Sequence, residues 1–453
     1  MVTQKINPCC ETLAAQSFSE ATRFWLRLGL ISFGGTAAHI AIMHDYLVER
    51  KKWVDNEDFF HALSHCMILP GPEAQQLAIY LGWKLNGIKG GIVAGTLFVL
   101  PSMFVLLALS IVYARFGSLP WIAAMFSGLR PAVLALVLLA LTRLAKRSLV
   151  EPVQWIVALG AFAAMSLLHA SVPFVMAVAI AVGFIVPKRR HSALPAPSTP
   201  RLNRALRKQA VASFAKISAA GLAIWLAPFL ALYLFGRDFP FWAELSLFFT
   251  RTAFVTIGGS YTVLPYVAHA AVSHYHWLSQ SQMLDGFALA ETTPGPLIIV
   301  VAFVGFMAGF HRFHGSIGAG TLALLLTTLY TFLPCFLFVF AGAPLIGWTQ
   351  HSRKMKTVLS LIIAVVFAAM ADLALFLARR SISLGRLQLR EDRLDRRRRS
   401  RSVALLTWIA PGKVRRRAWP KSRIRHCALA HWPIVCRLTA AIQLSDEILR
   451  HTT

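Results

Sequence analysis

Long apolar segments separated by short polar ones occupy the chain from about residue 24 to residue 378. Most of them lack a polar face at the 3.6-residue period, which is typical of helices surrounded by lipid. A hydrocarbon core about 30 Å thick needs about 20 apolar residues for each helical crossing. The pattern therefore predicts an all-α polytopic membrane protein with about 11 transmembrane segments. The expected segments are 24–43, 60–82, 90–113, 119–142, 153–168, 171–186, 217–236, 247–272, 283–309, 316–341 and 357–378.

The composition supports a membrane protein over a soluble one. Hydrophobic residues make up 57% of the chain and charged residues 14%, whereas a soluble protein carries about 25% charged residues. No P-loop or glycine-rich nucleotide fingerprint occurs, so we expect neither ATP-driven transport nor a bound cofactor. The sequence thus favours a secondary transporter over an enzyme.

The formal net charge of +27 is concentrated in two places. Residues 188–216 are basic and proline-rich, and we interpret them as a flexible cytoplasmic linker. This linker separates an N-terminal half, 1–187, from a C-terminal half, 217–379. The tail, 380–453, holds 18 Lys or Arg against five acidic residues.

The C-terminal half offers no counterpart of segments 153–168 and 171–186, so we expect it to be truncated. We favour a frame-shifted origin for the basic tail that follows, and a cytoplasmic surface-binding segment is the alternative. We do not expect the tail to bind nucleic acid.

An internal repeat at an offset of 224 residues relates the two halves. Pro70-Gly71-Pro72 aligns with Pro294-Gly295-Pro296, and Trp53 aligns with Trp277, without a gap. Seven expected segments separate the starts of the two copies, and an odd number reverses the second copy in the membrane. The sequence therefore predicts two homologous halves as an inverted-topology repeat with broken helices, the architecture of many secondary transporters.

Each copy begins with an arginine seven residues before a double glycine, in RLGLISFGG and RTAFVTIGG. Glycine is unfavourable inside a helix by about 1 kcal/mol, so we interpret each pair as a helix break whose free N–H groups face an anion. Close helix packing is the alternative. A guanidinium fork matches a tetrahedral oxyanion, although an arginine could also extend to the membrane surface. The candidates are Arg27, Gly34, Gly35, Arg251, Gly258 and Gly259.

The two PGP motifs predict a second break in each copy. The first proline disfavours helix for the residue before it, and the second suits the first turn of a new helix. That new N-terminus carries about half a positive charge, although a purely structural kink is the alternative. We expect Pro70, Gly71, Pro72, Pro294, Gly295 and Pro296 to bind substrate, and Glu73, Gln75, Glu291, Thr292 and Thr293 to serve polar or coupling roles.

His61 and His65 have the i, i+4 spacing of metal ligands. The second copy carries different residues at both positions, so we expect no metal site.

These blocks resemble the chromate ion transporter family in its two-domain, long-chain form. The resemblance covers about residues 18–378 and is carried by FWLRLGLISFGGTAAHI, LPGPEAQQLAIYLG, FVTIGGSYTVLPYV and LAETTPGPLIIVVAFVG. It implies export of chromate across the bacterial plasma membrane, giving chromate resistance. Sulfate is a second candidate substrate because both ions are tetrahedral dianions.

Two alternatives remain besides chromate export. One is a transporter or channel of the same architecture for another solute, and the other is an intramembrane metal-dependent enzyme using the histidine pair. The expected partners are chromate, sulfate and the lipid bilayer, and a homodimer is a candidate assembly.

Overall fold

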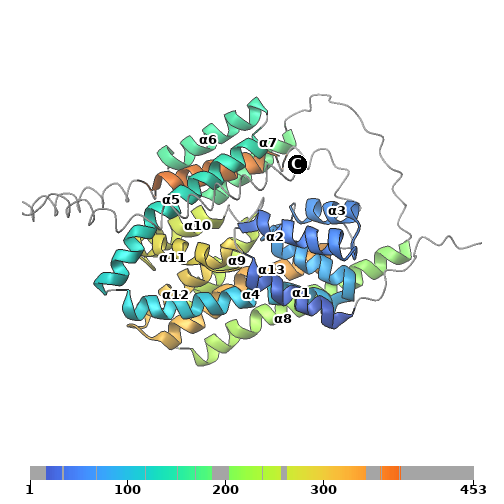
Figure 1. Ribbon diagram of the computed structural model, residues 1–453, viewed down its shortest axis with the longest axis horizontal. Helices are drawn as coiled ribbons and strands as arrows, with labels where there is room; N and C mark the ends of the chain where they lie inside the picture. Colours follow the sequence, from blue (N-terminus) through green and yellow to red (C-terminus); the bar gives the residue numbers. More distant parts are fainter. Residues whose placement is uncertain are drawn as a thin grey trace, which may run out of the picture. The chain divides into compact units, whose positions relative to one another are not determined.

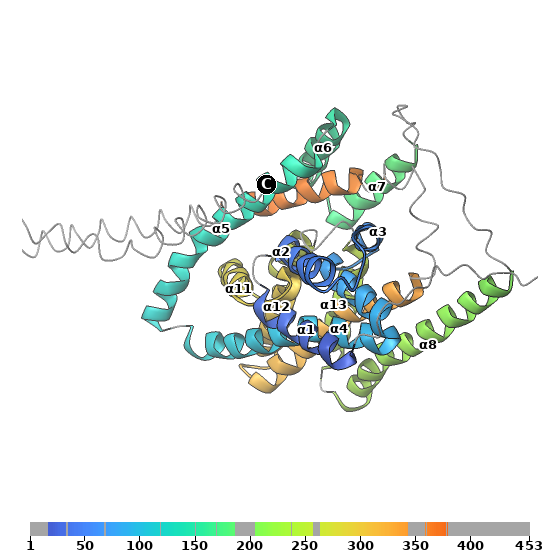
Figure 2. The same cartoon turned by 45° about the vertical axis from the view of Figure 1, so that its right-hand side comes forward.

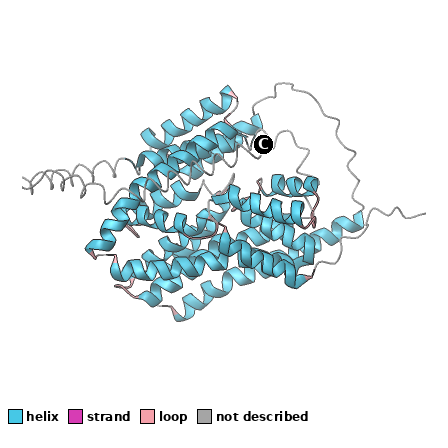
Figure 3. Ribbon diagram, in the orientation of Figure 1, coloured by secondary structure: helices cyan, strands magenta, loops and turns pink. Residues whose placement is uncertain are grey.

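The computed structural model consists of helices joined by short turns over the residues that it describes, with no strand among them (Figure 3). The chain divides into two compact units, Met1–Gly385 and Arg386–Thr453, and every described residue lies in the first. The all-α class predicted from the sequence is therefore confirmed for this part of the chain. The described residues are 17–32, 35–67, 69–117, 119–149, 151–168, 170–185, 204–236, 238–256, 263–342, 358, 360–376 and 378.

The first half contains seven α-helices and one π-helical turn among its described residues (Figure 1). They are α1 (Phe18–Ile31), α2 (Gly35–His44), the π-turn η1 (Asp45–Arg50), α3 (Asn56–Cys66), α4 (Glu73–Phe116), α5 (Pro120–Ser148), α6 (Pro152–Leu168) and α7 (Val172–Ile185).

The second half follows the same order as far as α13, after an additional long helix, α8 (Arg204–Phe235). A last apolar helix, Ser360–Phe376, is drawn in orange in Figure 1. The other elements are α9 (Phe239–Val255), α10 (Val263–His269), the π-turn η3 (Ala270–His274), α11 (Gln280–Thr292), the 3-10 turn η4 (Leu297–Ile299), α12 (Val300–Arg312) and α13 (Ile317–Gly342).

Details of the backbone recur at the 224-residue offset. Lys52 and His276 share a left-handed conformation, with φ of 51° and 52°, which costs a non-glycine residue about 1–2 kcal/mol. The buried Trp53 and Trp277 each donate their backbone N–H to the carbonyl six residues earlier, at 2.8 and 2.9 Å. An unfavourable conformation present in both copies shows that the repeat extends to local backbone geometry.

Helix α4 consists of two antiparallel arms. Asn86 and Gly87 leave helical geometry, with φ/ψ of −134°/25° and 64°/−160°. A Cβ atom built on Gly82 would lie 2.5 Å from the Cβ of Ala94, although twelve residues of straight helix would separate the two by about 18 Å. The chain therefore turns back here, as the second half does between α12 and α13, and the expected segments 60–82 and 90–113 are separate.

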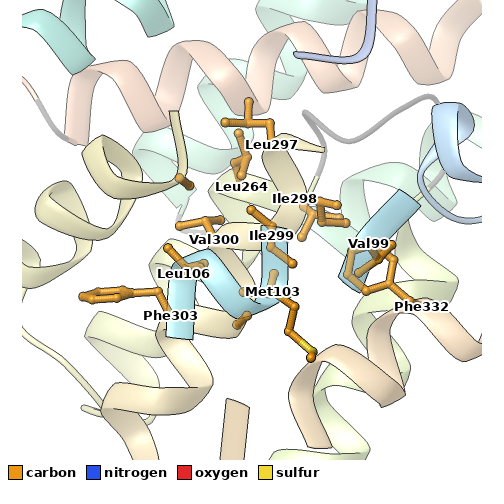
Figure 4. Close-up of a cluster of buried hydrophobic side chains, with 14 of the residues drawn as sticks. Val99, Met103, Leu106, Leu264, Leu297, Ile298, Ile299, Val300, Phe303 and Phe332 are labelled. Atoms are coloured by element: carbon orange, nitrogen blue, oxygen red, sulfur yellow. The ribbon is translucent and has the colours of Figure 1, made fainter. Parts of the chain in front are cut away.

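One hydrophobic core joins the two halves. It includes buried side chains from α1, α4 and α5 of the first half and from α9 to α13 of the second. Figure 4 shows Val99, Met103 and Leu106 of α4 close to residues 297–300 of the second half. Because the halves share this core, neither buries its apolar side chains alone.

Helices α6 and α7 form a second cluster with the first part of Ser360–Phe376 (Figure 2), whereas Met370, Leu373 and Ala374 of that helix belong to the main core. The Ser166 hydroxyl donates to Asp372 Oδ1 at 2.7 Å, and Gln154 Nε2 donates to Ser360 Oγ at 2.7 Å. Helix α5 and the end of Ser360–Phe376 both join this cluster to the main body, where the Gln280 side-chain amide donates to the Phe376 carbonyl at 2.8 Å. Two polar bonds in an otherwise apolar cluster fix the register between α6 and the last described helix.

The segment expected to be a flexible linker, 188–216, is helical in its last part. Helix α8 begins at Arg204 and continues into the apolar stretch Lys216–Leu234. The reason lies in the sequence RALRKQAVASFAK, which is rich in the strong helix formers Ala, Leu, Arg and Lys. The tail, 380–453, lies outside the described residues, so its frame-shifted origin and the truncation of the C-terminal half stay predictions.

Four described helices are long and apolar enough to cross a membrane, and four shorter ones are apolar. The long ones are Glu73–Phe116, Pro120–Lys146, Lys216–Leu234 and Ile317–Gly342.

Candidate functional site

The first helix of each repeat is interrupted near its double glycine. The chain leaves α1 at Ser32, in an extended conformation, and α2 begins at Gly35. The equivalent helix α9 ends before Thr256, and α10 begins at Val263. The helix is thus interrupted in both repeats at the predicted position. Gly34, Gly258 and Gly259 lie outside the described residues.

The PGP motifs form a second, matching interruption. Gly71 and Gly295 have φ of 124° and 118°, a region that residues with a side chain rarely adopt. Pro72 is the N-cap of α4 and Pro296 is the N-cap of η4, and neither helix start has a side-chain cap. Each motif, including Pro70 and Pro294, therefore separates one helix from the next, as its sequence predicts.

The interruptions of the two repeats are hydrogen-bonded to one another. The Gly71 N–H donates to the Thr256 carbonyl at 2.5 Å, and the Gly295 N–H donates to the Ser32 carbonyl at 2.7 Å. The two glycines are equivalent in the repeat, and so are the two acceptors. Each PGP motif thus bonds to the end of the first helix of the other half, in the reciprocal manner of a pseudo-two-fold axis.

The acceptor positions also share their side-chain chemistry. The hydroxyls of Ser32 and Thr256 both donate to the carbonyl four residues earlier, each at 2.6 Å, and both residues are fully buried. This bond satisfies the hydroxyl within its own helix. The hydroxyl thus does not compete for the glycine N–H of the opposite half, which bonds to the carbonyl of the same residue.

Space at the two glycines is too small for a side chain. A Cβ on Gly71 would lie 2.7 Å from Cys335 Sγ, and one on Gly295 would lie 2.5 Å from Ser102 Oγ. Ordinary contacts of this kind measure 3.4–4 Å. Both the backbone angle and the surroundings therefore require glycine.

The N-terminus of α4 combines free N–H groups with a buried polar side chain. Its first intrahelical bond runs from the Gln76 N–H to the Pro72 carbonyl at 3.0 Å, so the N–H groups of residues 73–75 have no partner within the helix. The Gln75 side chain is fully buried, and neither of its amide atoms has a hydrogen-bond partner among the described residues. An unpaired buried amide costs about 1–3 kcal/mol, so a polar ligand here would be stabilising.

The second break is less polar than the first. The Thr292 and Thr293 hydroxyls donate to carbonyls within α11, at 3.0 and 2.8 Å, and Glu291 is half-buried beside them. The residues after the break, 297–300, are apolar and buried. The residues that follow the break are therefore polar in the first half, at Glu73 and Gln75, and apolar in the second.

The two predicted arginines lie on exposed helix faces. Arg27 is exposed on α1, near the exposed apolar side chains of Leu26, Leu30 and Ile31, and Arg251 is exposed on α9. The structure does not place either guanidinium within the buried breaks. Their role in anion binding stays a prediction.

A partly buried charged cluster joins the halves elsewhere, and the sequence did not predict it. Asp285 of α11 accepts Arg130 Nε at 2.8 Å and the second guanidinium nitrogen at 2.9 Å, and the Tyr113 hydroxyl donates to it at 2.8 Å. Arg130 is the only charged residue of the expected segment 119–142. A lone charge at the centre of an apolar segment indicates function, and this signal could have identified it.

The histidine pair does not form a shared site. His61 is exposed, with Nε2 3.4 Å from Glu57 Oε1, whereas His65 is buried. Within the described part of the chain, no group of three or more His, Cys, Asp or Glu side chains is arranged to hold a metal ion.

Comparisons with known proteins identify the family. The sequence profile of the chromate transporter family matches residues 19–184 and 243–414, two segments that begin 224 residues apart. The second match extends past residue 379, into the segment that we expected to be a replaced tail. No solved structure is significantly similar to the chain.

Curated relatives cover most of both chains. The chromate transport protein of Cupriavidus metallidurans is 30% identical over 82% of this chain and 85% of its own length. That of Pseudomonas aeruginosa is 31% identical over 71% of this chain and 72% of its own. A probable chromate transport protein of Synechococcus elongatus is 27% identical over 81% and 86%. Two repeats with matched helix breaks, the apolar helices and these similarities show that the chain is a multi-pass membrane transporter of the chromate transporter family.

Proposed function

We propose that this chain is a secondary transporter that exports chromate across the bacterial plasma membrane and thereby gives chromate resistance, with sulfate as a competing substrate. The observation that carries the proposal is the reciprocal bonding of the two PGP breaks, in a family whose curated relatives are named chromate transport proteins. Helix breaks paired across a repeat are the form that binding sites take in many secondary transporters.

The substrate site that we propose lies at these breaks. The α4 N-terminus contributes free N–H groups and about half a positive charge, and the buried Gln75 amide contributes an unpaired donor. Glu73 opposes an anion by its charge, so we assign it, with Glu291, a role in coupling. We assign Arg27 and Arg251, which are exposed on α1 and α9, the role of attracting anions.

We further propose that the repeat is inverted in the membrane. Helices α1 and α2 together count as one broken segment, and α3 counts as one with the first arm of α4. Seven apolar segments then precede α9. An odd number places the pseudo-two-fold axis in the membrane plane. With four further segments from α9 onwards, the chain has about 11 segments in all.

The energetics suit a carrier that needs no ATP. Moving one elementary charge across the membrane is worth about 2.3 kcal/mol per 100 mV. A dianion that leaves a negative-inside cell gains about twice that value. The membrane potential alone therefore drives chromate outward.

The test is uptake of radiolabelled chromate by everted membrane vesicles that contain the full chain. We expect uptake above that of empty-vector vesicles, a dependence on the membrane potential and inhibition by unlabelled sulfate. Vesicles that show normal insertion of the chain and no chromate uptake would defeat the chromate assignment. Uptake of a different anion in the same vesicles would support the alternative substrate class.

A further inference from the structure

The buried cluster of Arg130, Asp285 and Tyr113 connects the two repeats at a point that the repeat itself does not explain. Arg130 lies on α5 and Tyr113 on α4, both from the first half, whereas Asp285 lies on α11 of the second. At the 224-residue offset the equivalents of Arg130, Tyr113 and Asp285 are Lys354, Leu337 and His61. A basic residue recurs at one position, but the phenol and the carboxylate do not. The complete set of three groups therefore occurs once and is not part of the paired helix breaks.

Three donors of this cluster converge on the two oxygens of one carboxylate. Arg130 presents two N–H groups in a fork, and Tyr113 adds an O–H to the same acceptor oxygen that receives one of them. A guanidinium fork binds carboxylate, sulfate and phosphate oxygens with the same bidentate geometry. The Asp285 carboxylate, itself an oxyanion, is bound by these three donors in the structure.

Arg130 is more exposed than the carboxylate that it binds. The Asp285 side chain is 3% exposed, whereas that of Arg130 is 22% exposed. The rings of Phe126 and Phe303 lie against Tyr113, with centroids 5.1 and 5.5 Å away. An incoming anion would thus meet the guanidinium first, while the apolar rings hold the phenol in place.

The charge balance makes Asp285 replaceable. An arginine within an apolar segment requires a negative partner, and in the structure that partner is supplied by the protein. A tetrahedral dianion could provide the same charge and the same oxygen geometry. The carboxylate and such an ion would then exclude each other from the fork.

We propose that Arg130 and Tyr113 form an oxyanion-binding site in which the Asp285 carboxylate competes with a tetrahedral dianion for the same donors. The inference rests on the proposed function for the class of substrate. It adds a second binding step, separate from the PGP breaks, at which substrate breaks a contact between the two halves.

The test measures binding of radiolabelled sulfate to the purified full chain in lipid nanodiscs. Asp285→Asn keeps the shape of the side chain but removes the competing charge, so we expect sulfate to bind about tenfold more tightly, which corresponds to about 1.4 kcal/mol. The matched control is Asp238→Asn, which removes the carboxylate of the more exposed Asp238–Arg312 pair. We expect that control to bind like the unmodified chain.

D285N alone leaves the Arg130 charge without its partner and could fail to fold for that reason. The double variant R130Q/D285N removes both charges, so it decides the question in that case. We expect it to lose the sulfate site that Asp285→Asn tightens, about one equivalent per chain, while sulfate binding at the PGP breaks remains. An unchanged number of sulfate sites in the folded double variant, or no tightening in folded D285N, would overturn the inference. If either result accompanies normal chromate uptake by the unmodified chain, the proposed function stands. Absence of both uptake and binding in the unmodified chain would instead refute the proposed function.

Discussion

Replacing Gly295 by alanine tests whether the PGP break is as constrained as its geometry indicates. An L-residue held at a φ of 118° costs about 1–3 kcal/mol. The new Cβ would also lie 2.5 Å from both Cβ and Oγ of Ser102, and overpacking of this kind costs about 1–3 kcal/mol. Because both effects act on the folded state, we expect Gly295→Ala to destabilise the chain by about 2–6 kcal/mol.

Two further variants separate the causes. Adding Ser102→Gly to Gly295→Ala removes the steric overlap but not the backbone strain, so it should restore only part of the loss. Gly128→Ala is the matched control, because Gly128 lies in helix α5 with no atom within 4 Å of its added Cβ. Alanine there should be neutral or slightly stabilising.

The assay is the fraction of detergent-solubilised protein that remains monodisperse after heating, followed by size-exclusion chromatography with fluorescence detection. Gly295→Ala should lose half of this fraction at a clearly lower temperature than Gly128→Ala. Equal melting of the two alanine variants would refute the reasoning, because it would mean that the break relaxes without resistance.

Three further experiments test other parts of the structure. Gln75→Leu removes an unpaired buried amide, so it should leave thermal stability equal or higher while lowering chromate uptake, and full uptake would contradict a ligand role. Arg27→Ala with Arg251→Ala should lower uptake without lowering stability, because both side chains are exposed, and undiminished uptake would remove them from the anion path. Asp372→Leu removes the acceptor of the Ser166 hydroxyl and should expose the last described helix to limited proteolysis, whereas Asp372→Asn, which keeps a carbonyl oxygen, should not.

The sequence was sufficient to locate the helix breaks because their cause is local. Proline lacks a backbone N–H and restricts the residue before it, so PGP predicts an interruption whatever surrounds it. The repeat was equally visible, because the matched motifs share one offset. The family resemblance rested on the same blocks and is confirmed by the comparisons.

The partners of these breaks could not be predicted, because they lie in the other half. Nothing near Gly295 in the sequence indicates that its N–H bonds to the Ser32 carbonyl. Likewise, Asp285 gains its importance only from Arg130 and Tyr113, which are more than 150 positions away. The helical structure of residues 204–216 was not predicted, because the prolines and charges around them indicated a linker. Their many helix-forming residues instead extend the apolar part of α8 towards its N-terminus.

The exchange of backbone bonds between the two PGP motifs constrains how such a chain can evolve. A lone copy would leave its glycine N–H and its helix-ending carbonyl without these partners in a buried region, so an ancestral single copy would have needed a second molecule to complete both breaks. Fusion of two copies makes that pairing permanent and intramolecular. Afterwards the side chains around each break are free to diverge, as Gln75 and Ile299 have done, while the backbone contacts keep the two copies matched.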